Sequence, residues 1–455
     1  MTVIELGLIT DDGDRPVEPA RRPLRRVDLR RLLVAAVAAL CLLTLAGSAL
    51  PVSHSPQRLW SIAFQDGGET FAMGSDQVYV LSSDTGKLTA YGARDGEVRW
   101  TNKQLIGVSW MSSVGSGMVL MPGANRTVEI DEPDGGQSSY EFPSETVALD
   151  EATGRQVWKL PGEANAVDNE RVLLVERADD GVEMRTLHGV RLRDGARLWA
   201  LPGAGTETLA VGSTLDPAAE RLATVSKRGE VKVYNMADGR LVAGAVVPWL
   251  GQDGSNESYS QVILESRTLY VESVERGKGS LTAYDTETMR RKWRVEARSY
   301  GGFYPCGPVL CVNGPEGTSG YERDTGALRW KVPGGTNGLP LPGGMLVLSE
   351  DASDGISEER ANIRNTLIDS ATGKHVAELG IGTVVWDYSN PQSKPYLLAR
   401  ASQPVDRTSL GVVDPTGKVQ LLGVMAPVLD DRCQVANALL ACVTTDGRLT
   451  VTDVG

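Results

Sequence analysis

The sequence predicts an all-β fold, a β-propeller made of four-stranded antiparallel blades. A turn ending in Thr-Gly or Asp-Gly returns along the chain at intervals of 37 to 58 residues, and a Trp often follows four residues after the Gly. Short apolar or β-branched runs bounded by Gly, Asp, Ser and Pro lie between these turns, which is typical of strands. Units of this size, each forming one small sheet, arrange radially into a ring. A β-sandwich or a β-solenoid is the alternative fold.

The turn and the Trp have a physical role in each unit. Gly supplies the positive φ of a tight hairpin, and Thr or Asp before it bonds to the turn amides. A Trp on the following strand can pack its large apolar face between neighbouring sheets. The turn glycines are Gly96, Gly154, Gly195, Gly239, Gly326, Gly373 and Gly417. The Trp residues in this slot are Trp60, Trp100, Trp158, Trp199, Trp293 and Trp330.

The number of blades follows from the turns. Eight turns occur within residues 66–424, and a composite of the C-terminal strands with Trp60 makes a ninth. One of the eight, before Trp293, is expected to have Thr288 in place of the Gly and one added residue. We expect eight blades, with seven to nine as the range, and one unit as an irregular insertion. The stretch from Pro122 to Ser139 is rich in Gly, Pro, Asp and Glu, so we expect a protruding loop there.

The two ends of the repeat region complement each other. Residues 448–453 match residues 280–285, where a turn and a Trp strand should follow, but the sequence ends without them. Residues 58–60 match residues 197–199, which form the missing kind of strand. We therefore expect the N-terminal strand to join the C-terminal blade and to close the ring, which leaves no blade unpaired.

The repeat resembles the quinoprotein-type propeller repeat, whose pattern is Ala-x-Asp-x-x-Thr-Gly-x-x-x-Trp. Residues 147–158 match this pattern closely, and the resemblance covers nearly all of residues 58–455. It implies that each Trp docks against the neighbouring blade. Within this group the chain is similar to the BamB-like propellers of outer-membrane assembly, which implies a role in assembling or monitoring proteins of the cell envelope.

The N-terminal residues predict a membrane anchor. Residues 32–50 carry no charge and are long enough to span a bilayer core of about 30 Å as a transmembrane helix. Six Arg residues stand between positions 21 and 31, so residues 1–31 should be a disordered cytoplasmic segment. Residues 51–57 are then a short linker, and residues 58–455 form the propeller outside the membrane. A cleaved signal peptide is the alternative, because small residues follow at positions 46–49.

Cysteine usage agrees with export. Cys306 pairs in sequence with Cys311, and Cys433 with Cys442, each pair flanking a short turn between expected strands. In an oxidising compartment each pair is expected to form a disulfide within one hairpin. Buried free thiols are the alternative. A metal site is disfavoured because the chain has three His residues and none is near a pair.

The charge of the chain limits its partners. The formal charge is −12, and residues 1–31 carry seven Arg against six acidic residues, so the remainder carries −13. A surface of this sign disfavours nucleic acid and anionic lipid as direct ligands. The expected partner is an envelope or secreted protein, with the membrane reached through the N-terminal helix.

No motif for catalysis is apparent in the sequence. The resemblance to quinone-dependent dehydrogenases would require two adjacent cysteines over the quinone, and no two cysteines here are adjacent. Hydrolase and phosphate-binding motifs are also missing. We expect no cofactor, no metal and no enzyme activity, but a binding platform. The alternative is a sensor for a sugar or a quinone in the central channel, where Trp110, Trp249 or Trp386 could line a pocket.

Overall fold

The structure is a computed structural model. It describes residues 55–455, except 106–107, 109, 124, 132–136, 182, 213–220, 252–257, 266, 300–301, 335–336, 352–362, 389 and 391. The chain divides into two units, residues 1–53 and residues 54–455, and the described residues all belong to the second unit. The expected cytoplasmic segment, transmembrane helix and most of the linker lie outside the described residues. Within the described part, no helix has the length and apolar character needed to cross a membrane.

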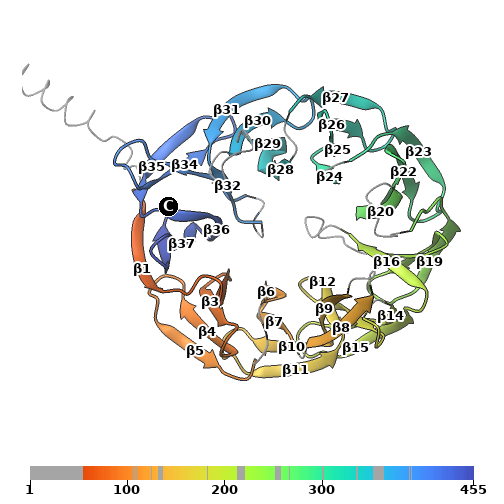
Figure 1. Cartoon of the computed structure of the whole chain (residues 1–455), viewed down its shortest axis with the longest axis horizontal. Helices are drawn as coiled ribbons and strands as arrows, with labels where there is room; N and C mark the ends of the chain where they lie inside the picture. The colour runs from red at the N-terminus through yellow and green to blue at the C-terminus, as the bar shows by residue number, and fades with distance from the viewer. Residues whose placement is uncertain are drawn as a thin grey trace, which may run out of the picture. The chain divides into compact units, whose positions relative to one another are not determined.

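The second unit is a ring of nine four-stranded antiparallel sheets, as far as the chain is described (Figure 1). We number the blades 1 to 9 from the first complete sheet. Blade 1 consists of β2 (Glu69–Met73), β3 (Gln77–Ser82), β4 (Lys87–Gly92) and β5 (Val98–Asn102). Blade 2 consists of β6 (Ser113–Gly115), β7 (Met118–Pro122), β10 (Glu145–Asp150) and β11 (Gln156–Pro161). Blade 3 consists of β12 (Glu163–Val167), β13 (Arg171–Arg177), β14 (Met184–Arg191) and β15 (Arg197–Pro202).

Blade 4 consists of β16 (Thr206–Val211), β17 (Arg221–Ser226), β18 (Glu230–Asn235) and β19 (Leu241–Val246). Blade 5 consists of β20 (Ser258–Glu265), β21 (Thr268–Glu275), β22 (Lys278–Asp285) and β23 (Arg291–Glu296). Blade 6 consists of β24 (Phe303–Cys306), β25 (Val309–Gly314), β26 (Gly317–Glu322) and β27 (Leu328–Val332).

Blade 7 consists of β28 (Asn337–Leu341), β29 (Met345–Asp351), β30 (Ile363–Asp369) and β31 (His375–Ile381). Blade 8 consists of β32 (Thr383–Val385), β33 (Tyr396–Arg400), β34 (Thr408–Val413) and β35 (Val419–Met425). Blade 9 consists of β36 (Val428–Ala436), β37 (Leu439–Thr444), β38 (Arg448–Asp453) and β1 (Gln57–Ala63). One 3-10 turn, η1 (Pro342–Gly344), joins β28 to β29. In Figure 1 the first strand of each blade faces the centre of the ring and the fourth strand lies at the rim.

The core of the ring lies between the blades. In β13 the four central residues, from Val172 to Val175, are all buried, although their side chains alternate between the two faces of the sheet. Both faces are therefore covered, as the short continuous apolar run in the sequence indicates. One apolar cluster joins Met118 and Ala148 of blade 2 to Val172 of blade 3. Each blade is thus stabilised by its neighbours on both sides.

The expected closure of the ring is confirmed. Strand β1 pairs antiparallel with β38, from Gln57 opposite Asp453 to Ala63 opposite Arg448. The preference for eight blades was wrong, because all eight turns belong to regular blades and the composite blade 9 adds one. The number nine lies within the expected range. The preference rested on how common eight-bladed rings are, and not on the repeats themselves.

The expected loop between Pro122 and Ser139 contains a further hairpin. Strands β8 (Asn125–Asp131) and β9 (Gln137–Pro143) form a two-stranded sheet inserted between β7 and β10. The hairpin lies against blade 3: Arg126 and Asp179 form an ion pair of 3.0 Å, and a Cβ on Gly181 would lie 2.1 Å from the ring of Phe142. Alternating strand residues were hidden there by the Gly, Pro and acidic residues of the connecting turn.

Candidate functional site

The Trp of the repeat lies at the interface between consecutive blades. The Trp158 indole nitrogen donates to the carbonyl oxygen of Leu192 in the turn of the next blade, at 2.7 Å. The indole covers Gly195 of that turn, where a Cβ would lie 2.8 Å from the ring. The other pairs of indole donor and covered glycine follow the same rule, Trp60 on Gly96, Trp100 on Gly154, Trp199 on Gly239, Trp293 on Gly326 and Trp330 on Gly373. These residues hold the ring together and are spread around it.

The turn of blade 5 departs from the repeat in a different way than expected. Met289, with φ of 54°, takes the position of the Gly, and no residue is added. Thr288 keeps the role of the usual Thr, because its hydroxyl donates to Asp285 at 2.8 Å. The preceding blade has Ala243 in the Trp slot, and Ala243 packs in the same apolar cluster as Met289. Blade 5 therefore fills with a methionine side chain the space that an indole fills elsewhere.

Two further blades have a smaller residue in the Trp slot. Blade 7 carries Ala377 there, and Gly417 of the next turn lies against it, since a Cβ on Gly417 would be 2.3 Å from the Ala377 Cβ. In blade 8 the position four residues after Gly417 is Leu421. The interfaces on both sides of blade 8 therefore lack the indole.

Both expected disulfides are present. Cys306 is bonded to Cys311, and Cys433 to Cys442. Cys433 and Cys442 face each other directly across β36 and β37. Of the four, Cys433 is partly exposed and lines the mouth of the central channel, whereas the other three are fully buried.

A cavity of about 1790 Å³ lies at one mouth of the channel, and we call it the mouth cavity. It is lined mainly by the turns that follow the first strands of the blades. In blade 8 this turn brings an aromatic pair, Trp386 and Tyr388, whose ring centroids are 4.7 Å apart. Tyr388 is 61% exposed, whereas Trp386 is buried and its indole nitrogen has no hydrogen-bond partner among the described residues.

Two charged side chains of the mouth cavity have hydrogen-bond partners. Glu265 of blade 5 accepts from the Arg323 guanidinium of blade 6 at 2.6 Å. Buried Asp387 accepts from the backbone amide of Asn437 at 3.3 Å. Burial first, and then the charge of Glu265, raise the pKa of nearby Tyr270 to about 12. Tyr270 therefore keeps its proton at neutral pH and is not poised to act as a base.

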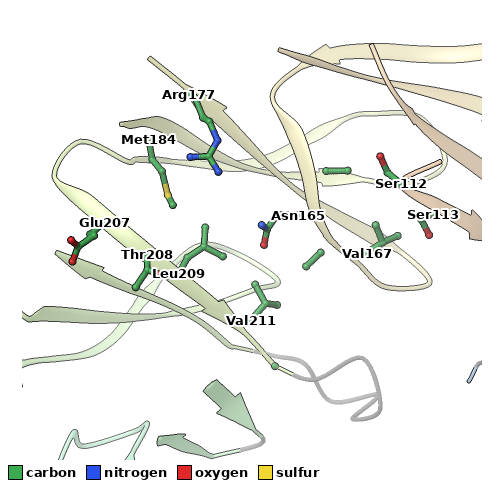
Figure 2. Close-up of a pocket in the computed structure, with 13 residues that line it drawn as sticks. Ser112, Ser113, Asn165, Val167, Arg177, Met184, Glu207, Thr208, Leu209 and Val211 are labelled. Atoms are coloured by element: carbon green, nitrogen blue, oxygen red, sulfur yellow. The ribbon is translucent and has the colours of Figure 1, made fainter. Parts of the chain in front are cut away.

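A second cavity of about 830 Å³ lies in the inner wall of the ring, and we call it the wall cavity (Figure 2). Strands β6, β12 and β16, the first strands of blades 2 to 4, form most of it, together with Arg177 at the end of β13 and Met184 at the start of β14. The two cavities adjoin, because Ser113, Val167 and Gly212 line both of them.

The three Trp residues outside the repeat have different surroundings. Trp386 lines the mouth cavity, and Trp249 donates its indole N–H to Glu207, which lines the wall cavity. Trp110 is 37% exposed. Among the described residues, no group of three or more His, Cys, Asp and Glu is arranged to hold a metal ion.

Sequence reasoning missed the residues of the wall cavity. Asn165, Arg177 and Glu207 stand in short strands without any motif, and what brings them together is the packing of two blades. The packing of Ala243 with Met289 could have been predicted from the sequence. The residue in the Trp position of each repeat can be compared with the residue in the Gly position of the next repeat. That comparison pairs the missing Trp of one blade with the missing Gly of the following blade.

Comparisons with known proteins agree with this architecture. Residues 139–332 match the family model described as outer membrane protein assembly factor BamB. No curated protein matches the sequence significantly. Among solved structures, one of the eukaryotic initiation factor is 9% identical and covers 80% of this chain and 89% of its own, with a TM-score of 0.51.

Two further solved structures have lower TM-scores. BamB from Moraxella catarrhalis is 15% identical, with 88% of this chain and 97% of its own covered and a TM-score of 0.42. Dihydro-heme d1 dehydrogenase NirN, in complex with DHE, is 17% identical, with 72% and 70% covered and a TM-score of 0.40. At these identities the structural likeness concerns the fold alone. Residues 139–332 are therefore similar to the family model of the outer membrane protein assembly factor BamB, and they lie within the ring of nine described sheets.

Proposed function

We propose that the chain is a non-catalytic scaffold that binds a protein of the cell envelope on the rim of its ring. The match of residues 139–332 to an assembly-factor family supports a role in protein assembly. The rigid ring supports a docking role, because each blade presents an exposed fourth strand whose outer edge is open to an added strand.

Two rim strands carry this proposal. Strands β19, with the sequence LVAGAV, and β35, with the sequence VQLLGVM, contain no charged residue. Leu241 and Val246 on β19 are 52% and 76% exposed, and Leu421 on β35 is 62% exposed. Each of the other seven rim strands contains at least one charged or ionisable residue, such as Arg99 on β5. An apolar, charge-free edge favours unwanted association unless a partner covers it.

The scaffold acts on the outer side of the membrane. Residues 32–50 anchor the chain. Residues 1–31 remain in the cytoplasm because they contain the Arg cluster that precedes the anchor. The two disulfides support export of the ring, since disulfides persist in oxidising compartments.

Site-specific crosslinking tests the scaffold. A photoreactive amino acid is placed at Val246 or Leu421 of the full-length chain in native membranes, and the crosslinked products are identified by mass spectrometry. The matched control is Leu328, which is 56% exposed on rim strand β27 beside Arg329 and Lys331. One envelope protein crosslinked at 246 or 421 and not at 328 is the expected result. Equal labelling at all three positions, or none, would contradict docking on the charge-free strands.

Binding of a small molecule in the channel is the second candidate function. The mouth cavity favours it, because a sugar could stack on the exposed ring of Tyr388, which lies beside Trp386. A screen of sugars, and of quinone with Ca²⁺, against the purified protein by thermal unfolding tests this function. A stabilising sugar whose effect is lost in Tyr388→Ala would favour it over the scaffold.

A further inference from the structure

The wall cavity is built where the regular strand pairing of the ring is interrupted. In β12 the register shifts between Ala164 and Ala166, so Asn165 is an extra, bulged residue. In the neighbouring first strand, β16, the shift between Thr206 and Thr208 makes Glu207 the bulged residue. Both bulged residues line the cavity. Bulges re-aim single side chains and are over-represented beside functional sites.

Among the pairings of first with second strands, two of the three interruptions lie at this cavity. A further shift, between Glu176 and Arg177 in the pairing of β13 with β14, lies beside Arg177 and Met184, which also line it. Of the nine first strands, as far as they are described, six pair with the second strand in unbroken register. Besides β12 and β16, β36 is irregular, in a longer segment around its disulfide.

Two hydrogen-bond donors point into the cavity. Figure 2 shows the Arg177 guanidinium and the Asn165 amide directed toward the same space, which Met184 and Leu209 border. Glu163 forms an ion pair with Arg177, at 3.8 Å from its Nε. An Arg fork with a neighbouring amide donor matches the two oxygens of a carboxylate.

The remaining wall decides what else the ligand must carry. Glu207 already accepts the Trp249 indole proton, and Figure 2 shows its carboxylate directed away from Arg177. Buried Met184, with Leu209 and Val211, supplies an apolar surface next to the donors. None of the 13 described residues that line the cavity is aromatic, so it offers no platform for stacking a sugar or a quinone.

We infer that the wall cavity binds a carboxylate that carries an adjoining apolar group, with Arg177 and Asn165 holding the carboxylate and Met184 and Leu209 contacting the apolar group. The volume of about 830 Å³ suits a ligand of this kind. Its source is either a small free acid or the C-terminal residue of a peptide chain. The site is independent of docking on the rim, so a failure of the crosslinking experiment would leave it standing.

Calorimetric titration of the full-length protein tests the site. The probes are N-acetyl-leucine, N-acetyl-leucine amide, and an acetylated hexapeptide ending in Leu with a free or an amidated C-terminus. The free acids are expected to bind at least tenfold more tightly than the amides, because the amides lack the charge that pairs with Arg177. Tighter binding of the free-acid hexapeptide than of N-acetyl-leucine identifies a chain end as the source, and the reverse order identifies a small acid.

Substitutions locate the binding on the proposed residues. Arg177→Gln is expected to weaken the binding of the free acids at least tenfold. Arg177→Lys is expected to recover part of this loss of affinity. The matched control is Arg185→Gln on the paired strand β14, because Arg185 does not line the cavity and this variant should bind as the unmodified protein does. Unchanged thermal unfolding shows that each variant is folded.

Three results would overturn the inference. They are equal binding of acid and amide, no binding of either acid at millimolar concentration, and unchanged binding in Arg177→Gln. The first two are measured on the unmodified protein, so they stand even if a variant fails to fold.

Discussion

Trp158 illustrates how a single side chain joins two blades. It is 6% exposed, donates to the Leu192 carbonyl and packs in a cluster shared by blades 2 and 3. Replacement by Ala removes a large apolar side chain from a close-packed interface and leaves the Leu192 carbonyl without this donor. We predict that Trp158→Ala lowers the free energy of unfolding by about 3–5 kcal/mol.

Urea unfolding followed by circular dichroism measures this loss. Trp110→Ala is the matched control, because Trp110 is 37% exposed and lies outside the repeat. The control should cost less than 1 kcal/mol or so, as expected of a surface substitution. Equal losses in the two variants would mean that the indole does not hold the interface.

Ala243 and Met289 allow the same interface to be rebuilt. Met289→Gly removes a buried side chain from the place where other blades have an indole, and Ala243→Trp alone places an indole against Met289. Each single variant should be destabilised, by about 1–3 kcal/mol. In the double variant the new Trp can cover the new Gly, so a favourable coupling of about 1–3 kcal/mol is expected.

A double-mutant cycle of unfolding free energies measures the coupling. A parallel pair, Ala243→Trp with Met184→Gly, serves as the control because Met184 packs in a different cluster. Additive losses in the first pair would show that the methionine does not stand in for the indole.

At the residue scale the sequence was informative where one side chain meets one turn. The spacing of four between Gly and Trp predicted the interface contacts, because both residues are set by local geometry. Two features require glycine at this position, the positive φ of the turn and the indole of the preceding blade that lies over it. The contact with the indole becomes evident only when one repeat is compared with the next. Thr288 was taken for the missing Gly, although it stands three residues after Asp285, where the repeat pattern has its Thr.

Among the elements, the inserted hairpin contributes least to the ring. Strands β8 and β9 lie outside the four-stranded sheet of blade 2. Their described contacts with blade 3 include an exposed ion pair between Arg126 and Asp179 and the packing of Phe142 on Gly181. An exposed pair of this kind is worth about 0–1 kcal/mol.

We predict that the hairpin can be removed without unfolding the ring. Replacing residues 124–144 by Asn-Gly places a two-residue turn between Gly123 and Glu145, of the kind that joins antiparallel strands. The expected loss is about 1–2 kcal/mol, and thermal unfolding should remain a single transition. Loss of the cooperative transition would show that the hairpin is part of the core.

The bulges of β12 and β16 could not be predicted. A bulge leaves the sequence pattern of a strand almost unchanged, and these strands are only five and six residues long. The extra residue is fixed by packing against the neighbouring blade. The wall cavity therefore appears only with the structure, whereas the disulfides, which depend on short hairpins, were predicted from spacing.

For the whole ring, the sequence predicted closure because the missing last strand was present at the other end. The number of blades was harder to predict, because each blade contacts only its two neighbours. No single residue therefore depends on the total number of blades in the ring. Repeat counting alone gives nine, and this agrees with the nine described sheets. Stability of the ring then depends on one join, between strands that are nearly 400 residues apart.

A covalent bridge across that join is predicted to stabilise the whole ring. Ser61 and Thr450 face each other across β1 and β38, with their hydroxyl oxygens 3.2 Å apart. A disulfide in Ser61→Cys/Thr450→Cys would close a loop of 390 residues, for which chain entropy sets an upper limit of about 6 kcal/mol. We expect a clear rise in the melting temperature under oxidising conditions.

The comparison that isolates the ring closure is a short bridge. Ser82 and Lys87 pair across β3 and β4 and are five residues apart, so a disulfide there closes a small loop and should raise the melting temperature less. Each single-cysteine variant controls for the loss of the native side chains. If the long bridge forms and stabilises no more than the short one, unfolding does not begin at the join of β1 and β38. A larger gain from the long bridge is the expected result, because it constrains nearly the whole repeat region while each blade buries its core only against its neighbours.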